Sequence, residues 1–139
     1  MAVTKTFERT IPFKAVHGHG FMPLVSVTFF PPTVDPFTLS LIFDTGATQI
    51  TLHPDYREWF PQGIAAEANV AGSTETAEGT ETTSTVEVLG RTLSNRKILF
   101  VDLGKPNPMF AGLFGRDCFT SFGFGFWENV REIYVTLKP

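Results

Sequence analysis

The sequence predicts an all-β fold, and three observations carry this prediction. Short runs rich in β-branched and aromatic residues recur along the chain, separated by Gly, Pro, Asn and Asp. Several of these runs alternate polar and apolar residues, as residues 4–11 do. No stretch carries a long apolar stripe with the 3.6-residue period of a helix.

The expected elements follow in chain order. We expect strands at residues 3–13, 22–30, 38–43, 49–52, 66–70, 80–88, 97–101, 123–127 and 133–137. A further short, buried strand should end at Gly115, directly before a single short helix at residues 116–121. Residues 31–36 contain three prolines, which cannot sit in a central strand. This segment is therefore predicted to be a loop or a wide hairpin between two strands.

Two further segments have an unusual composition. Residues 73–85 contain no large apolar side chain, which fits either a disordered linker or a protruding hairpin with its tip near Ala77, Glu78 and Gly79. In residues 122–127, Phe alternates with Gly. This alternation predicts a strand that packs its Phe face on the core and leaves room for a neighbouring backbone on its Gly face.

Length and composition bound the class of protein. A chain of 139 residues is expected to form one domain, over residues 1–139. Its net charge of −3 lacks the basic excess of a nucleic-acid-binding protein. The single cysteine, Cys118, excludes a disulfide framework and a cysteine-based zinc site. The fifteen Phe residues indicate either a core built from aromatic packing or an aromatic surface covered by a partner.

Nothing in the sequence resembles a membrane or export segment. The first ten residues lack the apolar centre of a secretory signal, and no apolar run approaches the roughly 18 residues that span a bilayer. We therefore expect a soluble, cytoplasmic protein with no membrane partner.

The most informative window is residues 38–48, in which a hydrophobic strand runs directly into Asp44. A buried strand is a rigid mount for a carboxylate at its end. Thr45 places a hydroxyl beside the acid, and Gly46 allows the backbone to turn tightly against it. Taken alone, Asp-Thr-Gly also fits a simple strand-ending turn.

A second window favours the functional interpretation. Residues 113–117 read Leu-Phe-Gly-Arg-Asp, and they follow residues 41–47, Leu-Ile-Phe-Asp-Thr-Gly-Ala, with the Thr- and Gly-containing segment in between. In this order the sequence resembles the retropepsin-like aspartic proteases, the single-domain proteases of retroviruses and their relatives, from about Leu39 to the C-terminus. The resemblance implies a closed or partly open β-barrel with a flap hairpin at about residues 70–88.

The resemblance also assigns roles to individual residues. It implies that Asp44 is catalytic, that Thr45 locks the two active-site loops together, and that Gly46 allows close approach of the substrate backbone. The residues that it places against the substrate are Ala47 and, in the flap, Ala77, Glu78 and Gly79. The residues to which it gives a structural role are Gly115, Arg116 and Asp117. Where the viral enzymes have an acid after this motif, the chain has Thr48, so the ion-pair partner of Arg116 is not identified.

Aspartic protease chemistry needs two carboxylates that share one proton, one acting as base and the other as acid. The chain has one Asp-Thr-Gly, and no other aspartate is followed by Thr-Gly. A homodimer with Asp44 from each subunit at its two-fold axis would complete the site. The expectation is thus an aspartic endopeptidase acting on polypeptides, without a metal or cofactor. The alternative is a domain of the same fold that binds peptide or dimerises without cleaving.

Other candidates for a site are weaker. His17 and His19 lie on one side of an extended segment and could form part of a metal site, although an exposed loop is the simpler interpretation. Cys118 beside Phe119 could be a nucleophile, but a packed apolar role is commoner. The chain has no Gly-x-Ser-x-Gly elbow of a serine hydrolase.

Overall fold

Ten strands and two 3₁₀ helices make up the fold. The computed structural model describes residues 9–61, 63–69, 76–102, 104, 107–126 and 131–137. The elements are β1 (Arg9–Val16), β2 (Gly20–Phe29), β3 (Phe37–Phe43), β4 (Ile50–Leu52), η1 (Pro54–Trp59), β5 (Ile64–Asn69), β6 (Thr76–Val88), β7 (Arg91–Phe100), β8 (Gly112–Phe114), η2 (Arg116–Ser121), β9 (Phe122–Phe126) and β10 (Glu132–Leu137).

Six of the strands close into a barrel. The hydrogen-bonded order runs β6-β7-β4-β8-β3-β2, and β2 also pairs with β6, which joins the two ends. Most pairs are antiparallel, but β3 with β8 and β4 with β7 are parallel. The prediction of an all-β barrel is confirmed, and the barrel is closed.

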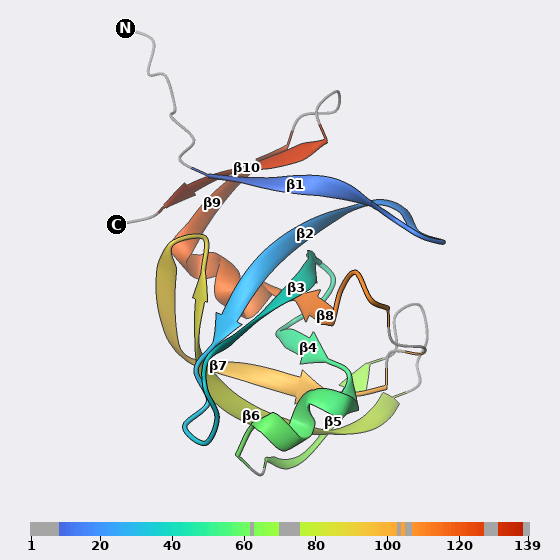
Figure 1. Cartoon of the computed structure of the whole chain (residues 1–139), viewed down its shortest axis with the longest axis vertical. Coiled ribbons are helices and arrows are strands. Elements are labelled where there is room, and N and C mark those ends of the chain that lie inside the picture. Colours follow the sequence, from blue (N-terminus) through green and yellow to red (C-terminus); the bar gives the residue numbers. More distant parts are fainter. Residues whose placement is uncertain are drawn as a thin grey trace, which may run out of the picture.

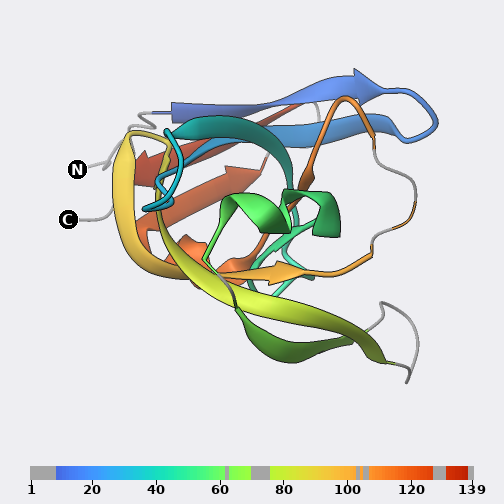
Figure 2. The same cartoon turned by 60° about the horizontal axis from the view of Figure 1, so that its bottom comes forward.

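Two additions extend this barrel. The first half of β1 pairs with β10, β10 pairs with β9, and the second half of β1 pairs with β2. These strands form the layer drawn above the barrel in Figure 1. On the other side β5 pairs with the first part of β6, and this β5–β6 hairpin reaches out beyond the barrel in Figure 2.

Aromatic side chains fill the core, as the composition predicts. One group is built on Phe29, whose ring stacks on Phe37 at 5.5 Å and meets Phe60 edge-on at 5.6 Å. A second group is built on Phe43, whose ring stacks on Phe119 at 4.8 Å and meets Phe124 at 4.9 Å. Offset and edge-to-face pairs at these separations add packing energy to the burial of apolar area.

Several predicted elements are confirmed. The proline-rich residues 31–36 connect β2 to β3, which pair as an antiparallel hairpin. The short helix lies at Arg116–Ser121, as predicted, and β8 ends directly before Gly115. In β9 the ring of Phe122 is buried, and on the opposite face a Cβ at Gly123 would clash with the Thr136 side chain of β10.

The predicted bounds differ from the structure by a few residues at several strand ends, and more widely in two places. Helix η1 was not expected, although Pro54 at its first position, Asp55 in its first turn and the side chain of His53 as its cap are start signals. Strand β7 begins at Arg91 rather than at residue 97, because a two-residue turn at Leu89 and Gly90, both with positive φ, returns the chain directly from β6.

The tip of the hairpin is also not where the sequence indicated. Ala77, Glu78 and Gly79 lie within β6, where they pair with residues 68, 67 and 66 of β5. The connection is therefore made by residues 70–75, which lie outside the described residues. Gly79 does not have the positive φ expected of a tip glycine. Its lack of a side chain serves close packing instead, since a Cβ there would clash with the Phe100 carbonyl of β7.

Candidate active site

Asp44 lies at the end of β3, on a turn held by the barrel. The three residues before it, Leu41–Phe43, are buried. The Asp44 N–H donates to the Phe114 carbonyl of β8 at 3.1 Å, which continues the β3–β8 ladder to the acid. Its carboxylate Oδ1 accepts a 2.8 Å hydrogen bond from the Gly46 N–H, and its carbonyl accepts from the Ala47 N–H at 3.3 Å. The carboxylate is thereby oriented by the backbone while it stays half-exposed.

The Gly-Arg-Asp segment braces the same turn from the other side. The Arg116 N–H donates to the Ala47 carbonyl at 2.9 Å, and the Asp117 N–H donates to the Thr48 carbonyl at 2.9 Å. Gly115 is buried against Gln49, and a Cβ at this position would clash with the Gln49 backbone. The structure thus brings together the two motifs that the sequence singled out, 71 residues apart in the chain from Asp44 to Gly115.

Two polar side chains at the turn have no partner within the described part of the chain. The Thr45 side chain is exposed and makes no hydrogen bond to a described residue. The Arg116 side chain is also exposed and forms no ion pair with a described residue, so its contribution inside this chain is the backbone hydrogen bond alone.

Asp117 lies at the start of η2 and is half-buried against β7. Burial raises the pKa of the Asp117 carboxyl above its usual range, and the hydrogen bond from Cys118 and the charges of Arg96 and Lys97 counter only part of that effect. Cys118 donates to Asp117 Oδ1 at 3.4 Å. Burial also raises the pKa of the Cys118 thiol, which disfavours the thiolate and fits a packed residue rather than a nucleophile.

One face of the sheet carries both Asp44 and part of the β5–β6 hairpin. Successive residues of a strand point to opposite faces, so Ile42 and Asp44 share a face, while Leu41 and Phe43 belong to the main core. Residues opposite Ile42 in register continue this face across the sheet. The row runs Ile42, Leu113, Thr51, Leu99 and Glu81, through β3, β8, β4, β7 and β6.

A polar contact at the end of this row was not foreseen. Gln49 Nε2 donates to Glu81 Oε2 at 2.9 Å and so joins the loop that carries Asp44 to β6. Glu81 Oε1 also lies 4.0 Å from Lys97 Nζ. The two partners are 32 residues apart, and no local pattern in the sequence marks the pair.

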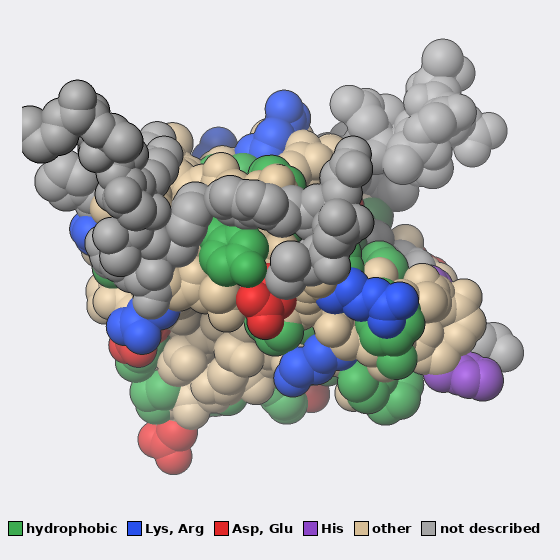
Figure 3. All heavy atoms as spheres, turned by 90° about the horizontal axis from the view of Figure 1, so that it is seen from above, with side chains coloured by type: hydrophobic (Ala, Val, Ile, Leu, Met, Phe, Trp, Pro, Cys, Tyr) green, Lys and Arg blue, Asp and Glu red, His purple; other side chains and the backbone are tan. Residues whose placement is uncertain are grey.

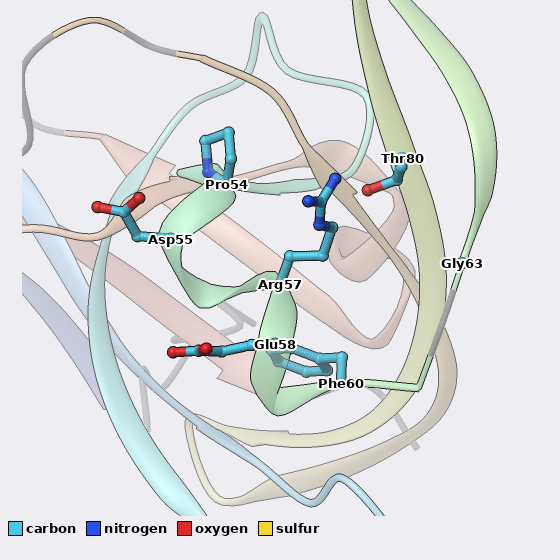
Figure 4. A pocket seen from close by; sticks show the side chains of 7 residues that line it. All are labelled: Pro54, Asp55, Arg57, Glu58, Phe60, Gly63 and Thr80. Carbon is cyan, nitrogen blue, oxygen red and sulfur yellow. The ribbon is translucent and has the colours of Figure 1, made fainter.

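A cavity lies away from Asp44. It has a volume of about 700 Å³ between η1 and the β5–β6 hairpin, and its lining includes Arg57, Phe60 and Thr80. Figure 4 shows Arg57 extending toward Thr80 while Asp55 and Glu58 point away from it. None of the site residues predicted from the sequence lines this cavity.

The remaining predictions concern metals and membranes. His17 and His19 are exposed around the β1–β2 turn, where the His19 ring meets Phe110 edge-on at 5.8 Å. The described residues contain no cluster of three or more His, Cys, Asp or Glu able to hold a metal ion. Within the same described ranges, no helix has the length and apolar character needed to cross a bilayer.

Comparison with known proteins identifies the fold. The sequence matches no protein-family model. A search of curated proteins also finds no match. Among solved structures, the chain is similar to the crystal structure of a retropepsin-like aspartic protease from Rickettsia conorii, with a TM-score of 0.59 over 95% of this chain and 96% of that chain, at 18% sequence identity. With its closed barrel, its β5–β6 hairpin and its two helical turns, the chain has an all-β, retropepsin-like fold.

Proposed function

We propose that the chain is an aspartic endopeptidase that works as a homodimer. The observation that carries the proposal is the geometry of Asp44. Its carboxylate stays accessible at the end of a buried strand, one oxygen is held by the Gly46 N–H, and the turn is braced by η2. A carboxylate with no catalytic or binding task does not require such a mount.

The mechanism follows from pairing two such turns. Across a two-fold axis, the two Asp44 carboxylates would hold one proton between them, because two like charges at close range cannot both ionise easily. The ionised member would take a proton from a water molecule as the water attacks a peptide carbonyl. The protonated member would donate to the carbonyl oxygen. Such a pair is active only between its two apparent pKa values, so we expect activity to be highest at mildly acidic pH.

In the proposed dimer, side chains without a partner among the described residues of one chain would contact the second subunit or the substrate. The exposed Thr45 hydroxyl would hydrogen-bond to the equivalent loop of the second subunit. Residues 77–79, in the hairpin, would lie over the substrate, which would bind as an extended strand through main-chain hydrogen bonds.

The dimer interface is proposed at β9. Strand β10 is paired on both sides, with β1 and β9. Among the strands that the structure describes, β9 ends the sheet order, as β5 does at the opposite end, and its outer edge would pair with a second copy. Phe126 of β9 is 63% exposed. Figure 3, which looks onto this layer, shows hydrophobic side chains among charged groups of both signs.

Substitution of Asp44 tests the proposal. Asp44→Asn keeps the size of the side chain and its acceptor for the Gly46 N–H, but it can neither act as a base nor share a proton. We expect the variant to lose at least about a thousandfold in cleavage of a denatured protein at mildly acidic pH, about 4 kcal/mol of transition-state stabilisation, while its dimer remains intact. Asp35→Asn, in the exposed proline-rich loop, is the control and should cleave like the parent protein.

Two outcomes would count against the proposal. Cleavage by Asp44→Asn close to the parent rate would assign the reaction to another group. A parent protein that dimerises and binds peptides but cleaves none would be a non-catalytic domain of the same fold.

A further inference from the structure

Glu81 places a negative charge at the end of a row of uncharged side chains. Of the five side chains in the row that shares a face with Asp44, only Glu81 is charged. Its neighbours across the sheet, Leu99 and Thr51, are buried. Glu81 lies in β6, the strand that forms one arm of the β5–β6 hairpin, which the proposed function places over the substrate.

The contacts of Glu81 leave its charge largely uncompensated. Gln49, which bonds Oε2, is neutral. Lys97 is the cation near Oε1, but their 4.0 Å separation is the outer limit of an ion pair, and the Lys97 side chain is 62% exposed. The Glu81 side chain is 22% exposed, and a long pair whose cation is mostly in water contributes little. An ionised carboxylate has about four acceptor positions, so Oε1 can still accept from a ligand.

The amide of Gln49 fixes where this carboxylate points. Gln49 is held through its backbone, which packs on Gly115 beside the bonds that brace the Asp44 turn. The hydrogen bond from its side chain therefore ties Glu81 to the same loop that carries Asp44. A carboxylate positioned relative to the scissile bond in this way can select one side chain of an extended peptide, because alternate side chains of a bound strand point to one face.

We propose that Glu81, oriented by Gln49, is a specificity-determining residue that selects a lysine or arginine side chain of the bound peptide. The inference deepens the proposed function and rests on it. The cation of such a side chain would meet Glu81 Oε1.

Peptide selection tests the inference separately from catalysis. Immobilised Asp44→Asn protein, which leaves peptides intact, is exposed to end-capped peptide pools. In each pool one position is fixed as lysine or norleucine and the others are randomised. We expect lysine to be enriched over norleucine by about fivefold at one position, the effect of one partly solvated ion pair. The enrichment should fall as salt is added.

Matched variants assign the effect to a residue. Glu81→Gln in the same background keeps an acceptor for Gln49 and should abolish the enrichment, with an unchanged unfolding transition as evidence that the fold is kept. Glu87→Gln, an exposed glutamate further along β6, should leave the enrichment unchanged. Lysine enrichment that persists in Glu81→Gln, or no enrichment in the Asp44→Asn parent, would overturn the inference.

Cleavage by the protein with Asp44 intact separates the two proposals. Cleavage without any preference for lysine or arginine would overturn the role of Glu81 and leave the protease assignment standing. Lysine selection by a protein that cleaves nothing would support the role of Glu81 in peptide recognition and overturn the assignment as an enzyme.

Discussion

At the scale of single residues, the Thr80 hydroxyl lowers the free energy of unfolding. Its hydroxyl is buried and makes no hydrogen bond in the described part of the chain. A buried polar group without a partner costs about 1–3 kcal/mol. We expect Thr80→Val to raise the free energy of unfolding by about 1 kcal/mol, measured by urea denaturation.

Ser84 of the same strand is the matched comparison. It is also buried, but its hydroxyl donates to the Thr85 carbonyl at 3.0 Å. Ser84→Ala removes a hydrogen bond that is made, so it should lower the free energy of unfolding by about 1 kcal/mol. If Thr80→Val and Ser84→Ala both destabilise the protein, the Thr80 hydroxyl has a hydrogen-bond partner in solution.

The half-buried Asp117 carboxyl predicts how the stability of the fold depends on pH. A carboxyl whose pKa is raised by folding holds its proton more tightly in the folded chain, so its contribution favours the folded state at low pH and is lost as the pH rises through the folded-state pKa. Asp117→Asn removes the buried charge and keeps an acceptor oxygen. We expect the variant to be more stable than the parent at neutral pH, with the difference disappearing in acid.

Denaturant unfolding at a series of pH values measures this effect, with the exposed Asp35→Asn as the control. A difference between Asp117→Asn and the parent that is the same at all pH values would mean that the charge of Asp117 is not its source.

Single residues leave a signal in the sequence where their structural constraint is local. Asp44, Gly46 and Gly115 could be singled out because each stands at the end of a hydrophobic run, where a turn or a close approach limits the residue type. The Gln49–Glu81 contact could not be foreseen, because only the register of β6 on β7 and of β7 on β4 brings these two residues together.

At the scale of elements, the residue pattern of the sequence predicts that a strand is present better than it predicts where that strand begins and ends. Residues 91–96 contain Ser, Asn and two Arg, so they lack the apolar alternation of a strand, yet they pair with β6. The pairing is irregular here: the register shifts between Ser84 and Val86, and Asn95 has a positive φ. A bulge of this kind is selected by tertiary pairing and leaves only a weak local signal.

The course of β6 predicts graded hydrogen exchange. Residues 76–79 pair only with β5, whereas residues 86–88 pair with both β7 and β2 in the closed barrel. We expect the amides of residues 76–79 to exchange much faster than those of 86–88, because a hairpin outside the barrel opens without disturbing the core. Mass spectrometry of peptide fragments measures this gradient.

A bound peptide should change hydrogen exchange only at the residues of β6 that exchange fastest. If the hairpin covers substrate, a peptide inhibitor of aspartic proteases will slow exchange at residues 76–79 and leave residues 86–88 unchanged. Equal hydrogen exchange at residues 76–79 with and without the inhibitor would mean that the hairpin does not cover the substrate.

At the scale of the whole molecule, the pairing of β2 with β6 closes the barrel, and the position of β9 at the end of the sheet leaves an edge open. The sequence could predict strands and an incomplete site, since one Asp-Thr-Gly supplies one carboxylate. It could not show that β9 ends the sheet of the described strands, opposite β5, because the place of β9 depends on how β1 and β10 pair over more than a hundred residues of separation.

Phe126 links this edge to the site. Its ring is 63% exposed, and it lies 6.3 Å from the ring of Phe43, the residue before Asp44. An aromatic group with this much exposed surface gains by burial in an interface, and a carboxylate placed there would face its own copy across the two-fold axis. We therefore expect Phe126→Asp to shift the protein to monomer and to lose cleavage in proportion to the dimer lost.

Sedimentation velocity and cleavage, measured on the same samples over a range of protein concentrations, test this expectation. Val34→Asp is the control, because Val34 is 39% exposed in the proline-rich loop, outside the proposed interface and the β5–β6 hairpin, and should leave the dimer intact. Phe126→Asp should recover activity at high concentration, since mass action restores the dimer without restoring the side chain. A monomer of Phe126→Asp that cleaves at the parent rate at every concentration would show that one Asp44 suffices, and the two-carboxylate mechanism would then be wrong for this chain.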